Sequence, residues 1–176
     1  MKKIFLTTLL SCAMIATAQE PEIPTSGVDR KHEIKVGAVK LLAGPILEAT
    51  YEYIQTADFT YGASILVNFD KGTDYYEDFA VTPFARFYFQ EKKEYGAKGF
   101  FVEGFGKYST GNYQWDLYDT EQNYSAVSLG LALGKKWINR TGFVFEILVG
   151  AGRTLGDNDN KPEATFRGDL NLGYRF

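Results

Sequence analysis

Apolar residues alternate with small or polar ones in eight segments of this chain. The segments span roughly residues 32–43, 45–55, 58–69, 79–90, 98–108, 123–135, 142–154 and 164–176. A sustained period of two is typical of a β-strand, whereas no segment after the first twenty residues keeps a helical spacing. We therefore expect an all-β protein with eight strands.

Length and composition favour a closed barrel. The chain has 176 residues, enough for one domain, and combines 16% aromatic residues with 18 glycines. An even number of strands joined in sequence predicts an eight-stranded antiparallel up-and-down β-barrel, here transmembrane and spanning residues 32–176. Pro83 lies inside segment 79–90 and predicts a bulge there.

The two faces of the strands distinguish a membrane barrel from a soluble one. In segment 123–135, Leu129, Leu131 and Leu133 share one face, with Ser128 on the other. Across the chain the second face also carries Lys35, Lys107 and a set of charges that we expect to form a lumen charge network: Glu48, Glu52, Arg86, Glu103, Glu146, Arg167, Asp169 and Arg175. An outer-membrane barrel turns its apolar face to lipid and its polar face inward. The alternative is a soluble, lipocalin-like periplasmic barrel with these charges in water.

Residues 1–18 read as a signal peptide. Lys2 and Lys3 precede the apolar stretch "IFLTTLLSCAMI", and "ATAQ" predicts cleavage between Ala18 and Gln19. An anchoring helix would need a longer apolar run, and a lipoprotein modified at Cys12 is a further alternative. Residues 19–31 are expected to form a flexible N-terminal lead.

Cleavage at this site would leave a mature chain without cysteine, and hence without disulfides or a thiolate metal site. It would also remove two lysines and move the formal charge from −3 to −5. An acidic chain without a basic stripe argues against nucleic-acid binding.

The connections predict a charge difference between the two ends of the barrel. Stretches 70–78, 109–122 and 156–163 hold ten acids and two lysines, whereas 55–58, 90–98 and 135–142 hold three acids and six bases. The first group is assigned to the outside. Its "DNDN", at 157–160, is typical of turns, with Ca²⁺ ligation as the alternative.

The longest outer connection, 109–122, contains Tyr113, Trp115, Leu117 and Tyr118. Its alternation suggests a protruding hairpin that could offer a sheet edge to a surface partner. The alternative is that these residues belong to the aromatic girdle at the level of the lipid headgroups.

The last strand carries apolar or aromatic residues at Leu170, Leu172, Tyr174 and Phe176. This pattern resembles the signal by which the barrel-assembly machinery recognises outer-membrane barrels. It predicts that machinery and outer-membrane lipid as partners, and the cell outer membrane as the location.

The whole span 32–176 resembles small outer-membrane β-barrel proteins of the OmpA/OmpX-like superfamily. The stretches "HEIKVGAVKLLAGPILEATYEY", "VTPFARFYF", "KGFFVEGFGKYS" and "TGFVFEILVGAGR" are similar to an uncharacterised domain-of-unknown-function family of Bacteroidota-type bacteria. The resemblance implies an eight-stranded barrel. It implies no activity and carries over no catalytic or binding residues.

The sequence offers little for catalysis. His32 is the only histidine, and no evident nucleophile lies beside it, which argues against the Ser-His-acid triad of a membrane-embedded lipid-modifying enzyme. We expect a non-enzymatic barrel without cofactor or metal, with a structural or surface-interaction role and no wide pore. A narrow channel or small-ligand carrier is the alternative, although eight strands leave an interior barely wide enough for side chains.

Overall fold

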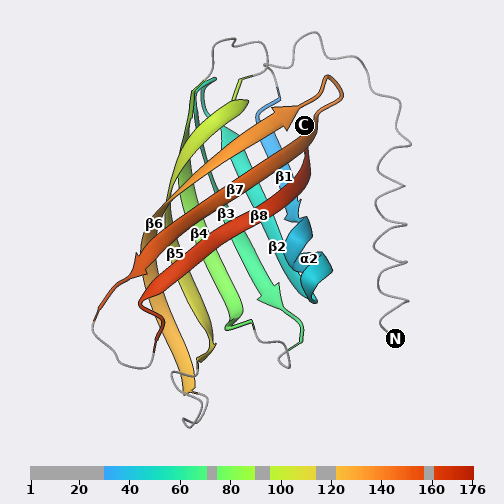
Figure 1. Cartoon of the computed structure of the whole chain (residues 1–176). Coiled ribbons are helices and arrows are strands. Elements are labelled where there is room, and N and C mark those ends of the chain that lie inside the picture. The colour runs from blue at the N-terminus through green and yellow to red at the C-terminus, as the bar shows by residue number, and fades with distance from the viewer. Residues whose placement is uncertain (1–29, 71–74, 90–95, 114–121, 157–160) are drawn as a thin grey trace.

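The computed structural model describes residues 30–70, 75–89, 96–113, 122–156 and 161–176 (Figure 1). They form a closed, antiparallel, eight-stranded β-barrel in up-and-down order, which confirms the predicted fold. The predicted signal peptide with its cleavage site, Ala18–Gln19, lies outside the described residues, as do residues 19–29 of the lead. The strands are β1 His32–Gly37, β2 Ile46–Ile54, β3 Phe59–Asn68, β4 Glu77–Phe89, β5 Gly99–Tyr113, β6 Gln122–Ile138, β7 Phe143–Thr154 and β8 Ala164–Arg175.

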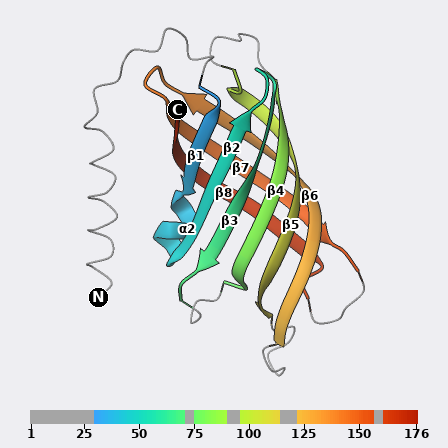
Figure 2. The same ribbon diagram turned by 180° about the vertical axis from the view of Figure 1, so that it is seen from behind.

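The barrel closes between its first and last strands, which pair from Glu33↔Arg175 to Gly37↔Asn171. The two views show the strands tilted around the lumen (Figures 1 and 2). We call the end at which β1 begins and β8 ends the inner end, and the opposite end the outer end. The tight turn at 55–58 lies at the inner end, between β2 and β3.

The alternation sorts the side chains largely as predicted, with most large apolar residues outside and the charged residues of the strands' second face inside; Phe84, Phe101 and Phe105 are among the apolar residues that also lie inside. Leu129, Leu131 and Leu133 are 56%, 67% and 60% exposed on the outer surface, whereas Ser128 is buried in the lumen. This arrangement is the reverse of the one expected for a lipocalin-like barrel, whose apolar side chains would fill the interior.

The expectation that segment 32–43 forms one strand is wrong in its second half. The strand β1 ends at Gly37, and Ala38–Ala43 form a short helix, α2, beside β2 and β8 (Figure 2). The register explains this break, because Glu33 and Lys35 point inward and a continued strand would turn Lys40 to the apolar outer surface. In the helix Lys40 instead reaches the inward carboxylates of Glu48 and Asp169. No helix in the described part of the chain is long and apolar enough to cross a membrane.

The bulge predicted at Pro83 is also wrong. Pro83 pairs with Ala63 on β3, and the β4–β5 register is the same on either side of it, at Val81↔Tyr108 and Phe84↔Phe105. The irregularity lies instead between Glu77 and Phe79. Three strands are longer than predicted, since β4 begins at Glu77, β5 ends at Tyr113 and β6 ends at Ile138.

Candidate functional site: the lumen charge network

The inward positions of the strands bring an unusual number of charges into one small interior. Buried in the lumen are the acids Glu33, Glu48, Glu52, Glu77, Glu103, Glu146 and Asp169, and the bases Lys35, Arg86, Lys107, Lys136, Arg167 and Arg175. Lys40, on α2, adds a further cation paired with Glu48. These fourteen described residues, the lumen charge network, therefore balance at seven charges of each sign. Balance matters because an unpaired charge in such an interior would be strongly destabilising.

Two ammonium groups lie among three carboxylates in the inner half of the lumen. The Nζ atom of Lys35 is 2.5 Å from Glu52, 2.7 Å from Glu146 and 3.3 Å from Glu33. Lys136 Nζ lies 2.8 Å from both Glu33 and Glu52. The three carboxylates come within 4.8 Å of one another, a spacing that could hold a metal ion. Because lysine ammonium groups already neutralise them, we assign this cluster to ion pairing rather than to a metal site.

Arg86, on β4, joins the carboxylates of three other strands. Its guanidinium donates to Glu52 at 2.6 Å, to Glu103 at 2.7 Å, and twice to Glu146, at 2.8 and 3.1 Å. The planar fork of arginine suits such multiple contacts, which the point charge of a lysine cannot reproduce.

Aromatic rings on β4 and β5 pack against Arg86, and glycines leave room for these rings. The Arg86 guanidinium lies 4.4 Å from the ring centre of Phe84 and 4.5 Å from that of Phe101. Each ring covers a glycine directly opposite on the next strand, Gly62 for Phe84 and Gly134 for Phe101. A Cβ atom at Gly134 would lie 2.3 Å from the Phe101 ring, so only glycine leaves room for it. The lumen is thus layered as glycine backbone, aromatic ring, guanidinium and carboxylate.

Arg167, on β8, extends the network towards the outer end. It donates to Glu103 at 2.6 Å, to Glu48 at 3.0 Å and to the Ser64 hydroxyl at 2.9 Å. Glu103 thereby accepts from both Arg86 and Arg167, one with each oxygen. The ion pairs therefore run without interruption from Glu33 to Glu48.

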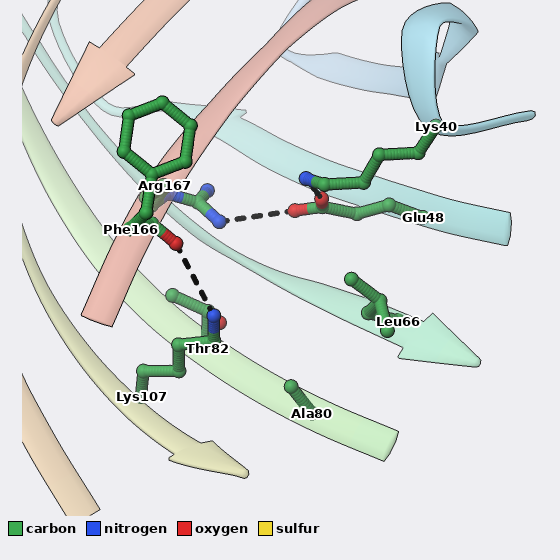
Figure 3. Close-up of a pocket in the computed structure, with 8 residues that line it drawn as sticks. All are labelled: Lys40, Glu48, Leu66, Ala80, Thr82, Lys107, Phe166 and Arg167. Carbon is green, nitrogen blue, oxygen red and sulfur yellow. Dashed lines mark hydrogen bonds and ion pairs between the residues drawn. The ribbon is translucent and has the colours of Figure 1, made fainter. Parts of the chain in front are cut away.

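The outer end of the lumen holds a small pocket (Figure 3). It is lined by Lys40, Glu48, Leu66, Ala80, Thr82, Lys107, Phe166 and Arg167. Lys107 pairs with Glu77 and also donates to the Phe166 carbonyl at 3.4 Å. Tyr75, just before β4, donates to Glu77 at 3.0 Å, and burial together with that carboxylate raises the pKa of the tyrosine hydroxyl. Tyr75 therefore remains a hydrogen-bond donor at physiological pH.

The inner end is closed by Arg175. This side chain pairs with Glu33 at 2.9 Å and donates to the carbonyl oxygens of Gly96 and Ala97 at 2.9 and 3.0 Å. Both residues have positive φ, 57° and 43°, and Ala97 is fully buried. Gly96 and Ala97 are thus held by Arg175 at the inner mouth of the barrel.

The structure brings together the eight charges that the sequence selected for a lumen network. Seven of them, Glu48, Glu52, Arg86, Glu103, Glu146, Arg167 and Arg175, belong to the chain of ion pairs just described. Asp169 lies at the edge, where it accepts from the backbone N–H of Val39 at 2.9 Å and lies 3.6 Å from Lys40.

Sequence reasoning missed four members of the network, one of which is Lys40 on α2. Glu77 and Lys136 were assigned to connections, but they are buried in β4 and β6. The register shift after Glu77 interrupts the alternation, so the pattern of alternate residues did not reveal that Glu77 faces inward. Lys136 could have been found, because it lies two residues after the inward-facing Gly134. Glu33 was also missed, although it lies two residues before Lys35 and therefore on the same face.

The remaining predicted features lie outside the lumen or outside the described residues. Leu170, Leu172, Tyr174 and Phe176 all face outward. His32 is exposed at the inner end, where its Nδ1 atom is 2.8 Å from the Tyr51 hydroxyl. The strands β5 and β6 extend into the predicted loop 109–122, but residues 114–121 are not described, nor is the predicted turn at 157–160.

Comparisons with known proteins found no match to this chain among protein-family models, curated proteins or solved structures. The resemblance to small outer-membrane barrels therefore stays a prediction.

Proposed function

We propose that this chain is an integral outer-membrane β-barrel protein that has a structural or surface-interaction role, catalyses no reaction and has no wide pore. The observation that carries the proposal is the reversed polarity of the barrel. Charged and polar side chains, together with a smaller set of apolar ones such as Phe84 and Phe101, fill the interior, whereas most large apolar side chains cover the outside. In water this distribution would oppose the hydrophobic effect, and contiguous exposed apolar surface marks an interaction site. In a bilayer it is the stable arrangement.

The positions of the aromatic side chains support a membrane-spanning orientation. Outward aromatics collect near the inner end, where Phe89 pairs with Phe100, Phe143 pairs with Tyr174, and His32 stacks on Phe176. Aliphatic residues such as Leu131 and Val149 occupy the middle of the wall, and Phe69 and Phe79 lie towards the outer end. Aromatic girdles that flank an aliphatic band are typical of outer-membrane barrels.

The packed lumen favours a role that does not depend on solute flow. At the level of Lys35, Arg86 and Lys136 the side chains are at most 1% exposed, so they leave no continuous aqueous path there. The strands β5 and β6 are the longest, at 15 and 17 residues, and exceed the roughly 9–11 residues needed to cross a bilayer. Their excess length supports a sheet that projects outward and could meet a surface partner.

The proposal is tested by fractionation and by gel migration. We expect the protein to remain in the outer-membrane fraction after an alkaline wash, and to migrate differently on a gel with and without boiling. Release into the soluble periplasmic fraction without detergent would favour the soluble alternative. Surface cross-linking with and without residues 114–121 would then test the interaction role, with removal of the inner turn 90–95 as the matched control.

A further inference from the structure

The barrel wall has a notch where β1 ends. The β1–β8 register stops at Gly37↔Asn171, and its continuation would place Lys40 opposite Gly168 and Leu42 opposite Phe166. Because α2 forms instead, β8 has no strand neighbour on this side from Ala164 to Leu170, within the part of the chain that the structure describes.

Side chains replace the missing backbone ladder at the notch. The Val39 and Leu170 N–H groups both donate to Asp169 Oδ1, at 2.9 and 2.8 Å, and Lys107 donates to the Phe166 carbonyl. Lys40 adds ion pairs to Glu48 and Asp169. The helix has six residues, none of them buried, and a helix this short is marginal on its own. This section of the wall therefore depends on a few side chains, whereas the other walls are held by continuous ladders.

Just inside the notch, part of the lumen is lined by apolar side chains. Ile46, Leu66 and Ala80 form a buried apolar cluster there, with Tyr75 packed against it. It is separate from the larger apolar cluster of the lumen, which includes Phe84 and Phe101. The pocket that contains Leu66 and Ala80 extends to Phe166, a residue of the outer surface (Figure 3). Outside the notch, Val39 and Leu42 are also exposed. Apolar surfaces thus lie on both sides of α2.

We propose that α2 is a displaceable section of the wall, and that its displacement admits an aliphatic chain of a membrane amphiphile to the cluster of Ile46, Leu66 and Ala80. The inference rests on the proposed membrane location. An aliphatic chain fits better than a charged headgroup, because the nearby cations Lys40, Lys107 and Arg167 already have carboxylate partners. The cavity has a volume of only about 10 Å³, room for about one water molecule, so α2 must move for a chain to enter.

The experiment measures whether lipid chains reach the cluster. The folded barrel is reconstituted into vesicles of phosphatidylcholine with brominated acyl chains, which quench tryptophan fluorescence on contact. In a background with Trp115→Phe and Trp137→Phe, Leu66→Trp reports from the notch, with Ile46→Trp as a second reporter. Phe101→Trp reports from the closed part of the lumen, and Leu131→Trp from the outer surface. Lys40→Ala then loosens α2, and Lys135→Ala, on the outer face, is its matched control.

We expect Lys40→Ala to increase the quenching of the notch reporters and to leave Phe101→Trp unchanged, with no effect of Lys135→Ala. Unchanged quenching of both notch reporters would overturn the displaceable wall, and so would an equal increase at Phe101→Trp, which would mean general loosening. In either case a quenched Leu131→Trp would leave the membrane location intact. An unquenched Leu131→Trp would overturn the membrane location and this inference with it.

Discussion

Arg86 on β4 and Glu146 on β7 meet across the lumen through two hydrogen bonds, 2.8 and 3.1 Å long. The strands β4 and β7 are not neighbours in the sheet, so this contact crosses the interior of the barrel. Both side chains are fully buried and each also contacts other members of the lumen charge network. The pair therefore connects two non-adjacent strands across the lumen and helps to fill the interior with side chains.

Removal of the Arg86 cation should strongly destabilise the barrel. Arg86→Met leaves Glu52, Glu103 and Glu146 short of a cation, and an uncompensated buried charge costs about 3–5 kcal/mol. Urea unfolding of the refolded barrel in detergent micelles, followed by tryptophan fluorescence, measures the loss. Arg153→Met, on the exposed outer face of β7, is the control and should change little.

The double variant Arg86→Met/Glu146→Gln restores the charge balance and should recover part of the lost free energy of unfolding. If the two substitutions were simply additive, the cross-lumen pair would not be coupled, and the network would be no more than a collection of separate contacts.

A methyl group at Gly134 should disturb the layered lumen. An added Cβ atom would lie 2.3 Å from the Phe101 ring and 2.6 Å from the Ile147 carbonyl oxygen. We expect Gly134→Ala to reduce the free energy of unfolding by about 1–3 kcal/mol. Gly104→Ala is the matched control, because its nearest neighbour would be Leu131 Cδ2 at 4.0 Å. Similar losses in both variants would mean that the ring and the glycine are not fitted to each other.

A charge introduced on the outer face should destabilise the barrel more in the middle of the bilayer than near its edges. Leu131 is 67% exposed in the middle of β6, and an arginine there should cost about 2–4 kcal/mol in a bilayer. Leu155→Arg, just beyond the outer end of β7, should cost about 0–1 kcal/mol. The measurement is reversible unfolding in lipid vesicles, and equal costs at the two positions would argue against a bilayer around the barrel.

The filled interior predicts a barrel without steady conductance. In planar bilayers the folded protein should show no stable open level at physiological salt, because the lumen charge network closes the path. A reproducible open level would favour the narrow-channel alternative and would require the ion pairs of Arg86 to separate.

Much of the fold followed from the sequence, because period two reports which residues share a face. The alternation could not reveal where a strand ends, because "AVKLLA" continues the apolar segment. The one sign of α2 in the sequence is that a continued strand would turn Lys40 to the apolar outer surface. The alternation also fails across the irregularity that hides Glu77. Which charges touch depends on register and on distances across the lumen, so the pairing of Arg86 with Glu146, 60 residues away, could not be predicted.

The most direct test of the membrane account is to label the reconstituted barrel with a phospholipid that carries a photoactivatable carbene precursor in its acyl chain, and to map the labelled residues by mass spectrometry. The account predicts label on the outward residues Leu129, Leu131 and Leu133 of β6, and none on Ser128, Ala132 and Lys136 of the same strand. Label on both faces of β6, or on neither, would contradict it.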